Sequence, residues 1–356
     1  MKGIKKLASL ILIFVMSVTF FIGCSSEAKV KESDNKTITV EDQLGRKVEV
    51  KRDANRIISS YYISTSILIS LNVKDKVVGI EAKAKNREMY KKVAKEFLDL
   101  PTVGTGKEIN VEECMKLNPD VVIIPTRLRS FIPQFEKLNI PVIAIEPETL
   151  EGFNKCVELL GKVSGSEERA KELLKYYDDT INKVKDMTKD IENRPTVYLS
   201  GSDNILKTCT SKMYQNYMID TAGGKNVTGN IDEGYWTNIS AEQLIDYNPD
   251  VIYVVGYANY TVEDVLADSK LKGINAIENK RVYLFPSTLE PWDYPTPSSI
   301  LGMLWIVNNL HPEKYSTDEF KKDAKGFYKR FYDLEVTDKE IGLWLKNILS
   351  YHIYLF

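Results

Sequence analysis

The chain has 356 residues, of which 43% are hydrophobic, and a formal net charge of −2 at pH 7. Its 48 basic residues are balanced by 50 acidic ones, so the composition excludes a protein whose main partner is nucleic acid, which needs a strongly basic surface. Two histidines are too few for a transition-metal site built from imidazole ligands. A chain of this length exceeds what one hydrophobic core usually serves, so we expect two lobes.

The N-terminal segment predicts export and attachment to a membrane. Three lysines precede an apolar run at residues 7–22, and the run ends at Gly23 and Cys24. This pattern is typical of a lipoprotein signal peptide, here residues 1–23, and the run is shorter than the roughly 20 residues of a spanning helix. We expect Cys24 to carry a lipid such as palmitate. Residues 24–36 then form a flexible tether on the extracytoplasmic face of the cell membrane.

The first lobe is expected at residues 37–165. It opens with a hairpin at 38–50, where alternating apolar residues flank Leu44-Gly45. Strands and helices then alternate, which indicates an α/β lobe with a mostly parallel sheet. The expected elements are strands at 56–60, 76–80, 121–124 and 140–145, and a helix at 64–71.

One unit occurs twice, at residues 111–124 and 241–254. Each copy predicts a short helix that ends at Asn-Pro, followed by an apolar strand. The residues before the two helices, Asn110 and Ser240, each have a Glu or Gln three positions on, which is the capping-box pattern. The repeat predicts two similar lobes with a cleft between them.

A rigid connection between the lobes is expected at residues 166–192. This segment is highly charged, has apolar residues at helical spacing and contains no internal Gly or Pro, so it predicts one helix of more than twenty residues. The second lobe follows at residues 193–356, with strands at 196–200, 251–255 and 281–285 and additional helices at its C-terminal end.

The repeat places Glu112 and Glu242 at equivalent positions in the first turn of their helices. Each acid alone is explained by the helix dipole, which is worth under about 1 kcal/mol at an exposed site. The alternative is that the pair is a matched docking feature, because the same residue occurs at the same place in both lobes. The residues themselves leave both interpretations open.

The sequence gives little support for a cysteine metal site or for an enzyme active site. Cys114, Cys156 and Cys209 have no metal-binding spacing and are expected to be small buried apolar residues. The sequence has no GxSxG or HExxH motif, and Pro101 and Glu108 stand where a phosphate-binding loop has glycine and serine or threonine. We therefore expect no enzyme, although a pair of carboxylates for glycoside hydrolysis or a structural lipoprotein stays open.

The ordered motifs resemble the substrate-binding lipoproteins of ABC importers for iron-siderophores, haem and cobalamin. The motifs that carry this resemblance are 39–50 with 56–58, 103–106 leading into 110–113, both Asn-Pro-Asp units, and 222–227. The resemblance implies two α/β lobes joined by one long helix, and a small-molecule metal chelate as cargo in the cleft. It also implies a permease and its ATPase as partners, with permease arginines contacting Glu112 and Glu242. No resident cofactor and no catalytic residue is expected.

Cargo-contacting residues are expected in the loops that leave the carboxyl ends of the strands, where ligands of open parallel sheets bind. The candidates are aromatic residues and arginines in or beside these loops: Tyr61, Tyr62, Arg87, Arg127, Arg129, Trp236, Tyr257 and Trp292. Guanidinium groups suit anionic chelates, and tryptophan faces stack on flat ligands. Each candidate also has an ordinary alternative as a solvated charge or a packing residue. Ferric siderophore is the first expectation for the cargo, then corrinoid or haem, then a nickel or cobalt chelate.

Overall fold

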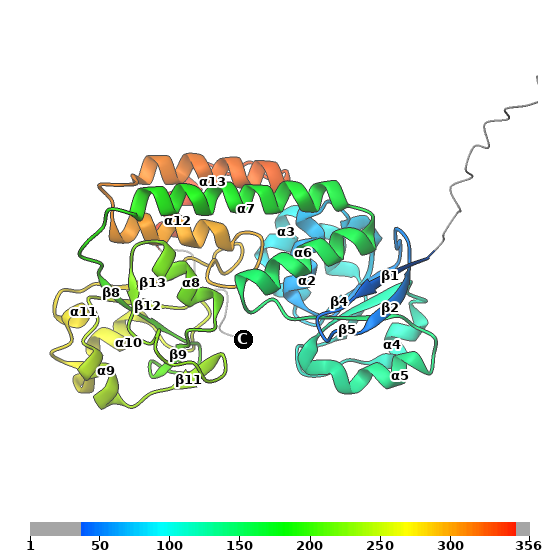
Figure 1. Ribbon diagram of the computed structural model, residues 1–356, viewed down its shortest axis with the longest axis horizontal. Helices are drawn as coiled ribbons and strands as arrows, with labels where there is room; N and C mark the ends of the chain where they lie inside the picture. Colours follow the sequence, from blue (N-terminus) through cyan, green and yellow to red (C-terminus); the bar gives the residue numbers. More distant parts are fainter. Residues whose placement is uncertain (1–36, 347–356) are drawn as a thin grey trace, which may run out of the picture. The chain divides into compact units, whose positions relative to one another are not determined.

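The computed structural model describes residues 37–346 (Figure 1). The expected signal peptide, the expected lipidation site Cys24 and the expected tether lie outside the described residues. None of the helices within 37–346 combines the length and the hydropathy that a membrane span requires. The fold is mixed α/β, as the sequence predicts.

The first lobe begins with the predicted hairpin, β1 (Thr37–Glu41) and β2 (Lys47–Lys51), whose turn contains Gly45 at φ +74°. A five-stranded parallel sheet follows, in the order β5, β4, β3, β6, β7. The strands are β3 Ile57–Ser59, β4 Val77–Glu81, β5 Thr102–Gly104, β6 Val121–Pro125 and β7 Val142–Ile145. The helices are α2 Tyr62–Ser70, α3 Glu88–Val93, α4 Val111–Lys116, α5 Ile132–Glu136 and α6 Leu150–Ser164, with 3₁₀ turns η1 Lys74–Lys76, η2 Ala84–Asn86, η3 Lys95–Asp99 and η4 Thr126–Phe131.

Both faces of this sheet are buried, which explains why its strands are continuously apolar. In β6, Val121 and Ile123 join the core that contains residues of α2 and α6. Val122 and Ile124 point to the other face and join the core with residues of α4 and α5. A strand covered on both sides needs no polar residue until it ends, so polar side chains appear where each strand leaves the sheet.

The second lobe contains a mixed sheet in the order β11, β9, β8, β12, β13, with β10 paired to β8. Strands β8, β10, β12 and β13 are parallel, and β9 runs antiparallel to both β8 and β11. The strands are β8 Thr196–Ser200, β9 Lys207–Cys209, β10 Lys225–Asn226, β11 Trp236–Asn238, β12 Val251–Val254 and β13 Val282–Leu284. The helices are α8 Tyr214–Thr221, α9 Ala241–Tyr247, α10 Val262–Ala267 and α11 Asn275–Glu278, with a 3₁₀ turn η5 Ser269–Leu271.

A single helix, α7 (Glu167–Thr188), leads from the first lobe to the second and confirms the predicted helix of more than twenty residues, with 22. Its apolar face is buried at helical spacing through Leu173, Tyr177, Ile181 and Val184. This face packs against α6 of the first lobe and against α8 and α12 (Ser299–Leu310). The helix is thus held along its length by elements from both sides.

The C-terminal segment adds two helices, α13 (Thr317–Tyr332) and α14 (Asp338–Leu345), which the sequence left without a role. Figure 1 shows α13 beside α7 and α12, and α13 also packs against α2 of the first lobe. Arg330 of α13 pairs with Glu172 of α7 at 2.6 Å. Although the sequence groups this segment with the second lobe, its contacts reach the first lobe as well.

The two repeated units form the predicted helix and buried strand, α4 with β6 and α9 with β12. The expected capping box is complete only at Ser240, whose hydroxyl and Gln243 satisfy each other's backbone amides. At Asn110 only half of it forms, because Glu113 pairs with Lys116 instead of returning to the cap. Asn118 and Asn248 adopt left-handed backbone, at φ 44° and 41°, and end the helices before each proline.

Candidate functional site

Polar and aromatic side chains gather at the carboxyl ends of the strands, as parallel-sheet geometry predicts. Tyr61 and Tyr62 follow β3, and Arg127 lies in the turn η4 that follows β6. In the second lobe Tyr257 follows β12. The segments that follow these short buried strands therefore carry the side chains that can form hydrogen bonds and ion pairs.

Two arginines stack on the paired tyrosines. The guanidinium carbon of Arg87 lies 3.8 Å from the ring centre of Tyr62, and that of Arg127 lies 4.5 Å from the ring centre of Tyr61. Nε of Arg127 also donates a hydrogen bond to the backbone oxygen of Gly106. Cation–π stacking fixes the plane of each guanidinium and leaves its edge as the hydrogen-bonding surface.

Two tyrosine hydroxyls bond to carboxyl groups, of which Asp293 is fully buried and Glu148 is half-buried. Tyr257 donates to Asp293 at 2.8 Å, and Tyr61 lies 3.4 Å from Glu148. Burial raises the pKa of Asp293 to about 7, and burial together with the charge of Glu146 raises the pKa of Glu148. The carboxyl groups are therefore poised to hold a proton more readily than an exposed acid does.

Tyr61 and Tyr257 stay protonated at neutral pH. Burial raises the pKa of Tyr61 well above its ordinary value, and the nearby Glu148 raises it further. Burial, followed by the charge of Asp293, acts on Tyr257 in the same direction. These hydroxyls consequently act as hydrogen-bond donors in the cargo-free protein.

Residues from both lobes meet in this cluster. The ring of Tyr294, in the proline-rich bend after β13, lies 5.4 Å from Tyr257 and 6.4 Å from Tyr62 of the first lobe. The backbone amide of Tyr214 in the second lobe donates to the carbonyl of Glu148 in the first, at 2.9 Å. The cluster is thus a shared feature of the two lobes.

Five of the eight predicted cargo residues belong to this cluster, which is completed by three residues outside those eight. The five are Tyr61, Tyr62, Arg87, Arg127 and Tyr257, and the three additions are Glu148, Asp293 and Tyr294. Their positions in the sequence could have indicated them, because Glu148 follows β7 and the other two lie in the proline-rich bend after β13.

The two tryptophans predicted to contact cargo, Trp236 and Trp292, differ in how deeply they are buried. Trp292 is 2% exposed, donates its indole N–H to Tyr328 of α13 at 2.9 Å and packs edge-on against Trp344 of α14. This burial supports the packing alternative for Trp292, which we leave out of the proposed cargo site. Trp236 in β11 is half-buried and lies close against Gly201, where an added Cβ would meet the indole ring at 3.0 Å.

The remaining predicted arginine, Arg129, is exposed in η4. Its charge, like that of Arg127, acts to lower the pKa of Glu146, although burial has the larger effect and raises it. Arg129 therefore lies near the acids of the site without a described contact to its tyrosines.

Glu112 and Glu242 are exposed at the second positions of α4 and α9. Neither forms an ion pair within residues 37–346. Hydrogen bonds from its own backbone amide and from Ser240 lower the pKa of Glu242. Both carboxylates are therefore exposed and available to an external partner.

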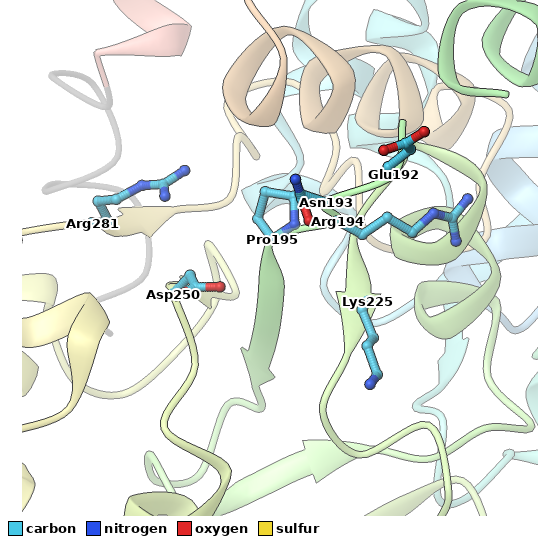
Figure 2. A pocket seen from close by; sticks show the side chains of 7 residues that line it. All are labelled: Glu192, Asn193, Arg194, Pro195, Lys225, Asp250 and Arg281. Carbon is cyan, nitrogen blue, oxygen red and sulfur yellow. The ribbon is translucent and has the colours of Figure 1, made fainter. Parts of the chain in front are cut away.

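A surface cavity of about 530 Å³ lies elsewhere, at the amino ends of β8, β10, β12 and β13. Figure 2 shows that its basic residues, Arg194, Lys225 and Arg281, point in different directions. Their positive groups therefore do not converge on one position where an anion could bind. Across residues 37–346, no three His, Cys, Asp or Glu side chains are grouped closely enough to hold a metal ion.

Comparison with known proteins defines the class. The family model described as "Periplasmic binding protein" matches residues 57–289, so the chain belongs to the periplasmic binding protein family. Proteins of this family are two-lobed, non-enzymatic transport components, which removes the glycoside hydrolase alternative.

Particular relatives cover most of the chain. It is 27% identical to the molybdate-binding protein MolA of Haemophilus influenzae, over 82% of this chain and 90% of that protein. It is 27% identical to the ABC transporter substrate-binding lipoprotein YvrC of Bacillus subtilis, over 87% and 99%, and 24% identical to the petrobactin-binding protein YclQ of the same organism, over 80% and 92%. The solved structure of MolA bound to molybdate matches with a TM-score of 0.75 at 25% identity, covering 84% of this chain and 99% of that one.

Proposed function

We propose that this protein is the membrane-anchored, substrate-binding component of an ABC importer, and that it captures an anionic metal compound and delivers it to a permease. The observation that carries the proposal is the two-lobe cluster in which Arg87 and Arg127 are stacked on Tyr62 and Tyr61. Arginine edges and tyrosine hydroxyls are donors suited to the oxygen atoms of such a compound. The lipoprotein YvrC, a relative over nearly the whole chain, supports anchoring through Cys24.

A ferric siderophore is the first candidate for the cargo. Its carboxylate or catecholate oxygens match paired guanidinium groups, and the relative YclQ is a petrobactin-binding protein. A flat corrinoid or haem needs a stacking face, and the burial of Trp292 leaves Trp236 as the tryptophan placed to supply one. A nickel or cobalt chelate remains the last of these candidates.

A second candidate is a small metal oxyanion. The relative MolA is a molybdate-binding protein and covers 82% of this chain. An oxyanion lacks the wide aromatic or aliphatic body of a siderophore, so it would use the arginine edges and tyrosine hydroxyls without Trp236. The contribution of Trp236 therefore separates the two cargo classes.

Docking on the permease is assigned to Glu112 and Glu242. Both are exposed, both occupy the second position of the same repeated helix, and neither is paired within residues 37–346. Arginines on a permease with two similar halves would bind one glutamate from each lobe. A role limited to the helix dipole predicts lower thermal stability and normal transport when either acid is replaced.

Native mass spectrometry of protein purified from its own source tests the cargo assignment. We expect an adduct whose mass identifies an iron chelate or a metal oxyanion and which the Arg127→Ala variant loses. The exposed Arg129 serves as a matched control, because Arg129→Ala removes the same charge without removing a stacked guanidinium. An adduct that contains no metal, or that both variants retain fully, would contradict the proposed cargo class.

A further inference from the structure

Large hydrophobic side chains are exposed at three places within residues 37–346: Met115, Leu138 and Ile245, with exposed fractions of 47%, 41% and 42%. Met115 belongs to α4 and Ile245 to α9. In the repeated unit these two residues occupy the same position, three residues after Glu112 and Glu242 respectively. Leu138 lies outside the repeat.

The geometry of each helix brings the acid and the apolar residue together. Residues three apart are neighbours on one helix face, so Met115 lies beside Glu112 and Ile245 beside Glu242. The preceding residues, Cys114 and Leu244, are fully buried. Because those two side chains fix the rotation of the helices against their lobes, Met115 and Ile245 are held outward.

Single exposed hydrophobic residues are common on protein surfaces and need no explanation, and Leu138 is one. The pairing in the repeat is different, since each lobe carries an exposed acid and an exposed large apolar residue at matching positions. The next residue is not shared, being Lys116 in one lobe and Asp246 in the other. The feature that the two lobes share is therefore the acid together with its apolar neighbour.

We infer that Glu112 with Met115, and Glu242 with Ile245, form two equivalent docking patches in which the apolar residue is an anchor for the permease. The inference rests on the proposed function and adds to it a contact that does not depend on charge. The occupant is a permease with two similar halves, since a partner with one binding surface would have no use for the same patch in both lobes. Each half would offer an arginine for the acid and an apolar socket beside it. Apolar contacts of this kind bury area at the centre of an interface, where charged residues are depleted.

The test measures affinity for the cognate permease–ATPase complex held in lipid nanodiscs. The variants are Met115→Ser, Ile245→Ser and the double variant, compared with Leu138→Ser as a matched control. We expect each single change to weaken binding by about fivefold, the double change by about 25-fold, and the control to have no effect. Met115→Leu and Ile245→Val preserve apolar surface and should bind as the wild type does.

The salt dependence of permease binding distinguishes the contribution of the apolar anchors from that of the acids. The loss caused by Met115→Ser or Ile245→Ser should persist from 50 to 500 mM salt, whereas the loss caused by Glu112→Ala or Glu242→Ala should shrink. Wild-type affinity of the double serine variant, with weakened glutamate variants, would overturn the anchor role and leave docking through the acids intact. Wild-type affinity of all these variants would overturn the docking proposal itself. Self-association of the wild type that the serine changes abolish would assign the patches to a second copy of the chain and refute the inference.

Discussion

Replacement of Glu290 by alanine should strongly destabilise the protein, because this buried acid is the centre of a hydrogen-bond network that joins several segments. Its carboxylate is fully buried and accepts hydrogen bonds from Ser66 of α2, Ser298 at 2.6 Å and Tyr332 of α13 at 3.0 Å, and the hydroxyl of Tyr62 lies 3.4 Å away. The network thus connects the first lobe, the proline-rich bend and the C-terminal helices.

The size of the expected destabilisation follows from the hydroxyl groups that lose their hydrogen-bond acceptor. Alanine at 290 removes the acceptor of four buried hydroxyl groups, and each unsatisfied buried group costs about 1–3 kcal/mol. Some of them can pair again, since the hydroxyls of Ser66 and Tyr332 are 3.5 Å apart. We therefore expect a loss of about 3–5 kcal/mol in the free energy of unfolding, which lowers the melting temperature by roughly 5–8 °C.

The Glu290→Gln variant adds a pH test. Burial raises the pKa of Glu290 in the folded protein, so the unfolded chain releases this proton at a lower pH than the folded one does. The contribution of Glu290 to stability is therefore complete below the unfolded pKa of about 4.3 and is lost as the pH rises toward the folded pKa. Glutamine does not titrate, so the stability difference between wild type and Glu290→Gln should narrow as the pH rises above the unfolded pKa of about 4.3.

Urea unfolding followed by circular dichroism measures both effects. Glu151 provides a matched control, because it is exposed on α6 and pairs with Lys155 at the surface, where its replacement by alanine should leave the free energy of unfolding nearly unchanged. A loss below about 1 kcal/mol for Glu290→Ala, or a Glu290→Gln difference that widens with pH, would refute this description of the network.

Three further predictions concern the cargo, the tryptophans and the anchor. Arg127→Ala should weaken cargo binding at least tenfold in a fluorescence titration while the melting temperature stays within about 2 °C of wild type, since Arg127 is exposed; equal affinity would remove it from the site. Trp292→Ala should cost about 3–5 kcal/mol of stability by opening the core, whereas Trp236→Ala should cost less, because Trp236 is only half-buried, and should weaken siderophore binding by about 1 kcal/mol or more. Calorimetry and titration of both variants check this, and the opposite pattern would reverse the two assignments. Cys24→Ala should move the protein from the membrane to the soluble fraction without changing cargo affinity, and membrane retention would argue against the lipid anchor.

Much of the fold was accessible from sequence because its signals are local. The repeated helix and strand, the hairpin around Gly45 and the long helix α7 depend on short-range patterns of capping, turn residues and apolar spacing, and all of them are present. The half-formed cap at Asn110 shows the limit of such patterns. Whether Glu113 returns to the cap or pairs with Lys116 depends on side-chain competition that spacing does not decide.

The cluster at the strand ends was accessible in part. Tyr61 and Arg127 follow buried strands directly, so the geometry of parallel sheets marks them. Glu148 and Asp293 look like ordinary surface acids in the sequence, and only the packing of distant segments brings them beside tyrosines and buries Asp293 fully. The burial of Trp292 was not visible in the sequence for the same reason, because the helices that cover it, α13 and α14, come later in the chain.

Reconstituted transport tests the central claim most directly. The measurement is uptake of the identified cargo into proteoliposomes that contain the cognate permease and ATPase, with this protein added outside. We expect uptake to depend on the wild-type protein and to be nearly abolished by the Glu112→Ala/Glu242→Ala double variant, which should still bind cargo with unchanged affinity. Full uptake without the protein, or full uptake with the double variant, would contradict a role as the docking substrate-binding component.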